Sequence, residues 1–186
     1  MKKSSVREFL SGEKHRILIP QEQMQQRIKE LGEEISHDYQ ESVPILVGVL
    51  NGAFIFLADL VRNLTIDCEI DFVKISSYGN AKESSGHIRV LKDLDADIEG
   101  RDVLVVEDIV DSGLSVQWLR KYFTSRKPRS VRFVTLLKKL GSARVPYEVE
   151  YVGFEIPNEF VVGYGLDYAQ LLRNLPAVYV LEDDED

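Results

Sequence analysis

Cysteine is nearly absent from this sequence of 186 residues, and Cys68 is the only one. An intrachain disulfide is therefore excluded. We interpret Cys68, which lies within a predicted strand, as a small buried hydrophobe. The three histidines, His15, His37 and His87, show no metal-ligand spacing. The sequence thus argues against both a disulfide scaffold and a zinc site.

Long apolar runs are also missing. No segment approaches the roughly 20 consecutive apolar residues of a membrane span, and we find no secretory signal. Positive charge is in deficit, because 23 Lys and Arg accompany 31 Asp and Glu, giving a formal net charge of -8. This balance disfavours a nucleic-acid backbone or an anionic membrane as the main partner. We therefore expect a cytoplasmic protein that binds neither nucleic acid nor membrane.

The composition that is present is ordinary for a soluble globular protein, with 44% hydrophobic and 29% charged residues. A chain of this length can build one sizeable core, so we expect a single domain over residues 1–186. Strand patterns alternate with helix patterns across residues 45–137, which predicts βαβ units. The fold class we predict is α/β, a doubly wound, mainly parallel sheet flanked by helices. The predicted strands include 45–50, 66–75, 103–106, 131–137, 148–154 and an edge strand 178–181, with helices at 21–39, 53–64 and 116–125.

Residues 103–115, V-L-V-V-E-D-I-V-D-S-G-L-S, are the centre of this pattern. The unbroken apolar run 103–106 suits a strand buried on both faces. Glu107 and Asp108 fall where we expect that strand to end, and turn and capping residues follow them before a helix. The first amides of a helix lack intrahelical partners and carry partial positive charge, so they bind phosphate well.

The loop before this helix contains neither Lys nor Arg. The sequence also lacks both G-x-x-x-x-G-K-[ST] and G-x-G-x-x-G, which argues against a nucleotide triphosphate and a dinucleotide. What remains is a cradle for one phosphate beside carboxylates that can accept hydrogen bonds from ribose hydroxyls. Helix capping alone is the alternative explanation for the acids and serines.

Four predicted strand ends carry polar residues. In a parallel sheet these ends share one edge, where ligands bind. The segments concerned are 50–52, 76–78, 107–108 and 138–139. Residues from 76 to about 86 are small and polar, which is typical either of a lid over a site or of a solvated hairpin tip.

The segment E-D-I-V-D-S-G-L-S behind its hydrophobic strand closely resembles the phosphoribosyl-diphosphate (PRPP) signature of type I phosphoribosyltransferases. The Glu107-Asp108 pair is similar to the form found in the hypoxanthine-guanine branch. The resemblance runs from about residue 45 to 175 and includes F-V-V-G-Y-G-L-D-Y at 160–168. It implies transfer of a phosphoribosyl group from PRPP to N9 of hypoxanthine or guanine, releasing pyrophosphate, with Mg²⁺ as cofactor.

The same resemblance implies an organisation of the chain. A core of about 44–140 would carry a small hood formed by about 1–20 and 145–186. A mobile loop of about 77–87 would begin at Ser77 and Tyr78. Family members usually form a homodimer or homotetramer.

Residue roles carry over by position. Asp111 corresponds to the family's general acid/base near purine N7, with helix capping as its alternative role. The ribose hydroxyls, the 5′-phosphate and pyrophosphate would be bound by Glu107, Asp108, Ser112, Gly113, Leu114, Ser115, Asn51, Gly52 and Arg173. The purine would be bound by Lys139, Phe160, Val161 and Asp167, and the metal by Glu107, Asp108 and Asp167.

Several alternatives accompany these assignments. Lys139 could be a solvated strand-end lysine, Phe160 a core side chain, and Arg173 one half of a surface salt bridge. The sequence also departs from many relatives by having Asn51 where they carry Lys or Arg, and the family often has a cis peptide bond between Leu50 and Asn51. A receiver domain, a PRPP-sensing regulator, and an adenine- or pyrimidine-specific relative are the competing functions.

Overall fold

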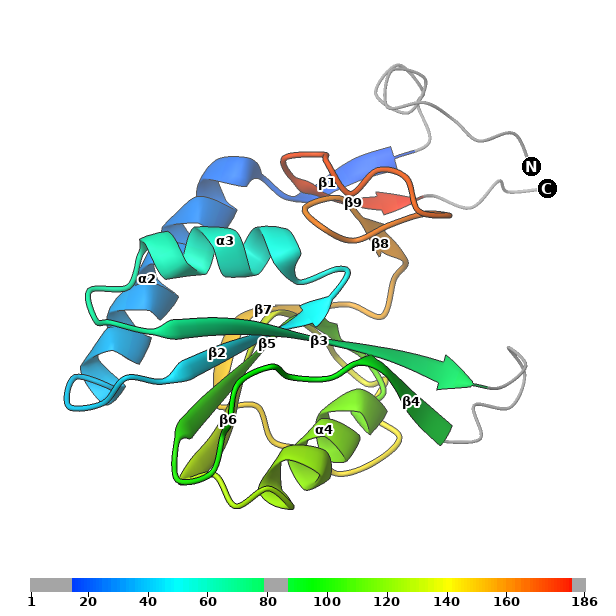
Figure 1. Cartoon of the computed structure of the whole chain (residues 1–186). Coiled ribbons are helices and arrows are strands. Elements are labelled where there is room, and N and C mark those ends of the chain that lie inside the picture. Colours follow the sequence, from blue (N-terminus) through cyan, green and yellow to red (C-terminus); the bar gives the residue numbers. More distant parts are fainter. Residues whose placement is uncertain (1–14, 79–86, 182–186) are drawn as a thin grey trace.

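The computed structural model describes residues 15–78 and 87–181. The described elements form a six-stranded sheet with flanking helices and a separate three-stranded sheet (Figure 1). The predicted mobile loop lies almost entirely outside the described residues. In chain order the elements are β1 (His15–Ile19), α2 (Gln21–Asp38), β2 (Ile45–Leu50), α3 (Phe54–Arg62), β3 (Glu69–Tyr78), β4 (His87–Lys92), β5 (Asp102–Val110), α4 (Leu114–Thr124), β6 (Ser130–Lys139), β7 (Tyr151–Ile156), β8 (Val161–Val162) and β9 (Val178–Leu181).

The large sheet has the strand order β4-β3-β2-β5-β6-β7. Neighbouring strands run parallel except for β4, which pairs antiparallel with β3. The chain passes from β2 to β3 on one side, whereas β5 lies on the other side of β2. The order of strands therefore reverses between β2 and β5, and ligands bind beyond the carboxyl ends of strands at such a switch point.

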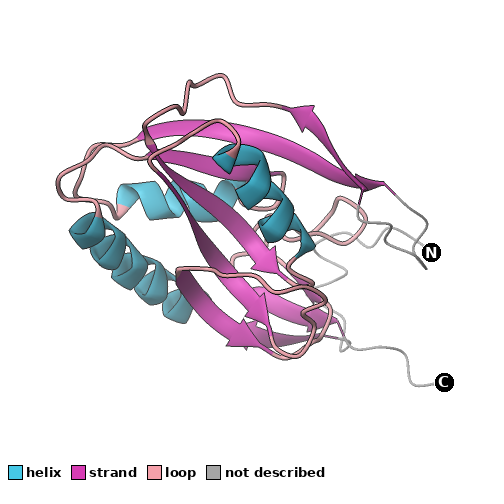
Figure 2. Ribbon diagram, turned by 90° about the horizontal axis from the view of Figure 1, so that it is seen from below, coloured by secondary structure: helices cyan, strands magenta, loops and turns pink. Residues whose placement is uncertain are grey.

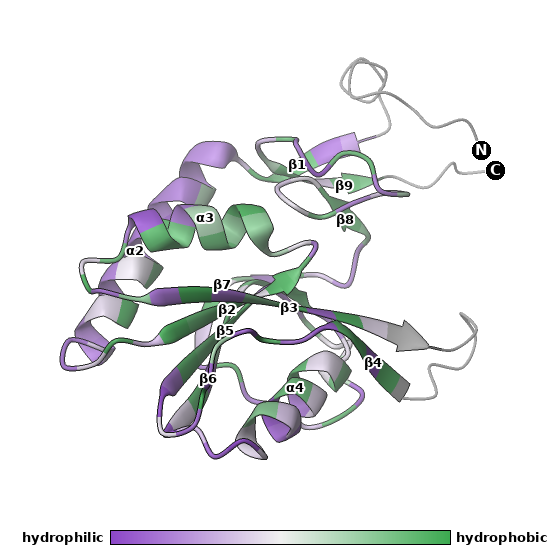
Figure 3. Ribbon diagram, viewed as in Figure 1, coloured by the Kyte–Doolittle hydropathy of each residue, from purple (hydrophilic) through white to green (hydrophobic). Residues whose placement is uncertain are grey.

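Helices cover both faces of this sheet, which confirms the predicted doubly wound, mainly parallel fold. α2 and α3 lie on one face and α4 on the other (Figure 1), and Figure 2 shows α4 from below, across the sheet. Alternate residues of β2 face opposite sides. One hydrophobic cluster therefore joins β2 to α4, and a second joins it to α2 and α3. Apolar residues are concentrated on the strands and α3, while much of α2 is hydrophilic (Figure 3).

The periodic apolar positions predicted for α2 form its buried stripe, namely Met24, Ile28, Leu31 and Ile35. Within the described residues, no helix combines the length and apolarity needed to cross a bilayer.

The small sheet joins the two ends of the described chain in the order β1-β9-β8. β9 pairs antiparallel with both neighbours, with His15 opposite Leu181 and Val161 opposite Val180. The prediction that residues 178–181 form an edge strand was therefore wrong. β9 is the middle strand, because β1 flanks it on one side and β8 on the other.

Several strands, β5 and β3 among them, continue further than the sequence predicted. β5 reaches Val110, so Glu107 and Asp108 lie within the strand and not at its end, because pairing with β6 continues to Val110 opposite Lys138. β3 similarly includes Ser77 and Tyr78, which pair with β4.

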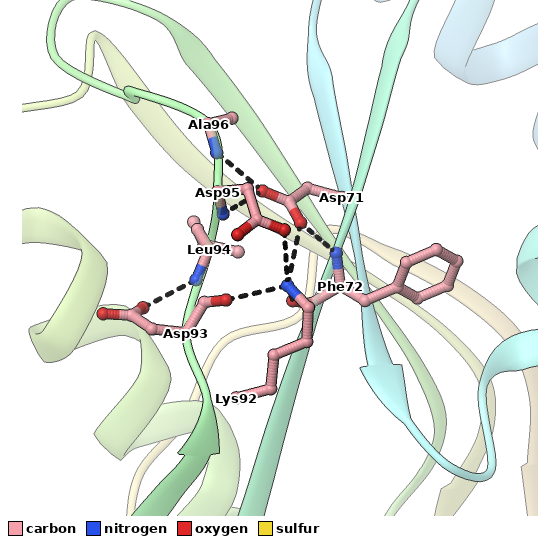
Figure 4. A network of polar contacts seen from close by, with 7 residues as sticks. All are labelled: Asp71, Phe72, Lys92, Asp93, Leu94, Asp95 and Ala96. Atoms are coloured by element: carbon pink, nitrogen blue, oxygen red, sulfur yellow. Dashed lines mark hydrogen bonds and ion pairs between the residues drawn. The ribbon is translucent and has the colours of Figure 1, made fainter.

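A buried carboxylate fixes the connection between β4 and β5 to β3 (Figure 4). Asp71 accepts hydrogen bonds from the backbone amides of Phe72 at 2.6 Å, Asp95 at 2.8 Å and Ala96 at 2.9 Å. Lys92 Nζ lies 3.4 Å from the same carboxylate. Burial alone would raise the pKa of Asp71, but these amides and Lys92 hold it below its ordinary value. This network secures the base of the β3–β4 hairpin.

Candidate active site

The turn after β2 meets the acidic pair of β5 at the switch point. A Cβ built on Gly52 would lie 1.5 Å from Asp108 Oδ2, so the Asp108 carboxylate occupies the space that a side chain would need. The Leu50–Asn51 peptide bond is cis, as the resemblance implied. Gly52 is buried and Asn51 is exposed. The two segments predicted to hold pyrophosphate and ribose are therefore in direct contact.

The loop between β8 and β9 packs on the same turn. A Cβ on Gly165 would lie 2.1 Å from the Gly52 carbonyl oxygen, and Gly165 has a φ of +100°, a region that favours glycine. Arg173 Nη1 donates to the Gly165 carbonyl at 2.7 Å, and the Gly165 amide donates to the Arg173 carbonyl at 2.8 Å. The backbone around Gly165 is thus held against the turn by Arg173.

Arg173 also forms an ion pair with Asp167, with 2.8 Å between Nη2 and Oδ1. The charges of this ion pair also affect a carboxylate of the site. Arg173 lowers and Asp167 raises the pKa of Asp108, so the charges of both reach that carboxylate. Arg173 therefore forms a salt bridge and also lies beside the site.

The two β5 carboxylates lie in a desolvated environment. Burial, together with the adjacent charge of Asp108, raises the pKa of Glu107 well above its ordinary value. Burial likewise raises the pKa of Asp108 to about 6, although the Ile109 amide donates to Oδ1 at 2.8 Å. Both groups would be stabilised as carboxylates by a nearby cation.

This donor set fits magnesium held jointly with a substrate. Within residues 15–78 and 87–181, no group of three or more His, Cys, Asp or Glu side chains is arranged to hold a metal by itself. Mg²⁺ commonly binds through one or two carboxylates and completes its shell with water and substrate phosphate oxygens. Two adjacent carboxylates whose pKa values are raised by burial meet that requirement.

The loop predicted to bind phosphate, residues 111–113 and called the phosphate loop below, follows β5 and leads into α4. Gly113 is the N-cap residue of α4, with a left-handed φ of 78°, and no side chain caps the helix. Capping therefore does not explain Asp111 and Ser112, and the first amides of α4 are left without a side-chain partner. The sequence suggested that Gly113 allows an anion to approach. In the structure its Cβ side is filled by the ring of Tyr147, so an anion must approach the amides from elsewhere.

Asp111 and Lys139 lie together beside this loop. Lys139 Nζ is 3.2 Å from Asp111 Oδ2, and the Lys139 side chain is only 13% exposed. The alternative that Lys139 is a solvated strand-end lysine was therefore wrong.

Phe160 is 53% exposed and contacts Tyr168 edge-on at a centroid distance of 6.0 Å, so the alternative of a core phenylalanine was wrong too. Val161 follows as a buried residue of β8. An exposed aromatic ring is thus attached to a rigid strand.

Sequence reasoning missed the segment that backs the phosphate loop. Ser142 Oγ donates to the Asp111 carbonyl at 3.0 Å, and the Arg144 amide donates to the Ser112 carbonyl at 3.0 Å. This segment has no apolar periodicity, so no local pattern predicted its contacts. Ser77 and Tyr78 stand at the end of β3, opposite Ile88 and His87 of β4.

Comparison with known proteins shows which family this chain resembles. Residues 18–169 match the model of the phosphoribosyl transferase domain. Hypoxanthine-guanine phosphoribosyltransferase of Bacillus subtilis is 47% identical over 167 residues, which is 90% of this chain and 93% of the relative. The Mycobacterium bovis protein of the same name is 48% identical over 181 residues, covering 94% of this chain and 90% of the relative.

Solved structures agree. A hypoxanthine phosphoribosyltransferase from Staphylococcus aureus aligns with a TM-score of 0.90 at 39% identity, covering 96% of this chain and 97% of that one. A hypoxanthine-guanine phosphoribosyltransferase from Bacillus anthracis, with HEPES in its active site, gives 0.87 at 45% identity, covering 91% and 99%.

The chain belongs to the phosphoribosyltransferase family. Its close identity over nearly the full length of both sequence relatives places it in the hypoxanthine-guanine branch of that family. The family predicted from E-D-I-V-D-S-G-L-S is thereby confirmed.

Proposed function

We propose that this enzyme transfers the 5-phosphoribosyl group of PRPP to N9 of hypoxanthine and guanine, giving IMP or GMP and pyrophosphate in purine salvage. The observation that carries the proposal is the meeting of the Gly52 turn, the β5 carboxylates and the start of α4 at one sheet edge. This meeting occurs in a chain that matches hypoxanthine-guanine phosphoribosyltransferases over nearly its whole length.

PRPP binding is divided among three groups of residues. Glu107 and Asp108 accept hydrogen bonds from the ribose hydroxyls. The amides and hydroxyls of residues 112–115 bind the 5′-phosphate, where the partial positive charge of α4 favours it. Asn51, Gly52 and Arg173 bind pyrophosphate, and the contact of Gly165 with Gly52 supports this assignment.

Magnesium is the cofactor we propose, held by Glu107 and Asp108 with Asp167 close by. When bound it would neutralise charge on the departing pyrophosphate. The chain's own contribution is to present these carboxylates on a rigid central strand, with Arg173 beside them.

The purine is recognised by a second set of residues, apart from those that bind pyrophosphate. Lys139 donates to the 6-oxygen, Phe160 stacks on the base, and Val161 and Asp167 complete the binding of its edge. A cationic donor accepts a carbonyl but leaves the amino group of adenine facing another donor. Sites built around such a hydrogen bond reject the wrong analogue by about 10⁴. Asp111, already paired with Lys139, is close to where N7 would lie and serves as general acid/base.

We further propose a homodimer or homotetramer in the cytoplasm, on the basis of family membership. A Trypanosoma cruzi hypoxanthine phosphoribosyl transferase, 40% identical with a TM-score of 0.87, was studied for the role of its C-terminal region in oligomeric state and activity. In this chain the last described strand, β9, belongs to the small sheet.

One assay tests the proposal. Purified enzyme, PRPP and Mg²⁺ are combined in turn with hypoxanthine, guanine, xanthine, adenine and uracil, and pyrophosphate release is followed. We expect turnover with hypoxanthine and guanine and almost none with adenine or uracil. Efficient formation of AMP or UMP would make the adenine- or pyrimidine-specific alternative correct. An enzyme inactive with every base would overturn the proposal.

A further inference from the structure

Three consecutive residues of the phosphate loop are each contacted by one short segment, residues 142–147, which we call the bracing segment. Ser142 Oγ bonds the Asp111 carbonyl, and the Arg144 amide bonds the Ser112 carbonyl, both at 3.0 Å. The next loop residue, Gly113, packs against the ring of Tyr147. The backbone of the loop is thereby held at every residue before α4 begins.

The contact between Tyr147 and Gly113 is made by ring carbons. A Cβ on Gly113 would lie 2.0 Å from Cδ1 and 2.7 Å from Cε1 of Tyr147. Gly113 is buried as a result. It also has a left-handed φ of 78°, a conformation that favours glycine. Both features explain why glycine is needed at this position.

The far side of the bracing segment is anchored to α4. Tyr147 packs against the hydrophobic cluster that contains Val116, and Gln117 Nε2 donates to the Pro146 carbonyl at 3.4 Å. A cavity of about 400 Å³ lies beside the ring, lined in part by Val116, Gln117, Pro146 and Tyr147. Tyr147 therefore contacts the hydrophobic cluster of α4 on one side and the loop residue Gly113 on the other.

A phosphate bound by main-chain amides depends on the direction of those amides, because each hydrogen bond weakens steeply as its angle departs from linear. No side chain caps α4, and the Gln117 amide of the helix bonds only the last loop residue, at the Gly113 carbonyl, at 3.0 Å. We propose that Tyr147 is a positioning residue, which holds the loop 111–113 so that the amides at the start of α4 point at the 5′-phosphate. Ser142 and the Arg144 amide assist it. This inference rests on the proposed function and assigns a residue to its 5′-phosphate subsite.

The test separates ligands that carry the 5′-phosphate from those that do not. For Tyr147→Ala we expect KM for PRPP and Kd for IMP and for ribose 5-phosphate to rise about tenfold, or about 1.4 kcal/mol. KM for hypoxanthine and Kd for pyrophosphate should stay within about twofold of wild type. Tyr147→Phe keeps the ring carbons and should restore wild-type values for all five. Ser142→Ala should show the same selectivity at about threefold, which provides a second route if Tyr147→Ala does not fold.

Tyr122→Ala is the matched control, because Tyr122 packs against the same hydrophobic cluster but is not among the residues that contact the loop. It should lower Tm without the selective loss. The proposal is overturned if Tyr147→Ala and Ser142→Ala lower Tm while IMP and ribose 5-phosphate bind as in wild type. It is also overturned if all ligands weaken equally. A wild-type enzyme that binds ribose 5-phosphate but makes no nucleotide contradicts the proposed function and leaves the binding test of Tyr147 intact.

Discussion

Lys139 at the end of β6 and Asp111 in the phosphate loop form an ion pair, with 3.2 Å between Nζ and Oδ2. Lys139 is nearly covered, whereas Asp111 is 52% exposed. The proposed donor to the purine 6-oxygen and the proposed general acid/base near N7 are therefore adjacent before any ligand binds. In the proposed function the two groups would contact neighbouring atoms of the same base, so their replacement should produce distinguishable kinetic defects.

Asp111→Asn should lower kcat by about 10²- to 10⁴-fold, the range typical of a lost general acid/base. KM for PRPP should change by less than about threefold, because the amide keeps the size of the carboxyl group. Steady-state kinetics with hypoxanthine measure both. Equal losses in kcat and PRPP affinity would assign Asp111 to binding instead.

Lys139→Met keeps most of the apolar stem and removes the charged donor. The loss of one charge-assisted hydrogen bond should reduce kcat/KM for hypoxanthine and guanine by about 10- to 100-fold. KM for PRPP should remain nearly constant, since Lys139 is proposed to contact the purine and not PRPP. If the variant uses hypoxanthine as well as wild type does, Lys139 has no part in base recognition.

Gly165→Ala should weaken pyrophosphate binding by at least about tenfold, because the new Cβ would displace the Gly52 carbonyl from its position. Gly100→Ala is the matched control, since Gly100 also has a positive φ, +70°, but has nothing within 4 Å of a built Cβ. Both variants should lose stability through backbone strain, of order 1 kcal/mol. Isothermal titration calorimetry with pyrophosphate then separates the effect of the Gly52 contact from the effect of backbone strain. Similar pyrophosphate affinities in the two variants would contradict the prediction.

Asn51→Lys should tighten PRPP and pyrophosphate binding by about fivefold, because Asn51 is exposed beside the turn and brings no charge. The gain should shrink as salt is raised from low to about 0.5 M, where exposed charges are screened. Asn51→Gln, which adds length without charge, is the control. Tighter binding by both variants would show that reach, and not charge, was missing.

Stability should depend on Asp102 in the acid range. Hydrogen bonds from Arg129 and Ser130 lower the pKa of Asp102 from 3.8 to about 2, although its burial opposes this. A lowered pKa stabilises the fold by about 2 kcal/mol above pH 4, and that contribution disappears as pH falls toward 2. Asp102→Asn should thus unfold at lower urea concentration at pH 7, and its deficit should fall by about half at pH 3. A deficit independent of pH would exclude this ion pair as the cause.

The sequence predicted the parts of the site that follow strands of unbroken apolarity. Residues 103–106 required burial on both faces, so the position of Glu107 and Asp108 beside a phosphate loop could be inferred. The lengths of the strands could not, because Val110 is strand only through its partner Lys138. Burial of Lys139 and the packing of Tyr147 on Gly113 likewise depend on segments that no local pattern brings together.

The small sheet has a consequence for how the enzyme matures. The strand that carries Val161 is completed by β9, and β9 in turn pairs with β1, the first strand described. A polypeptide halted on the ribosome before Val178 already contains every strand and helix of the large sheet, yet the support for the proposed purine contacts is missing. Competence for nucleotide synthesis would therefore follow only once β9 has been made and has paired with β1 and β8.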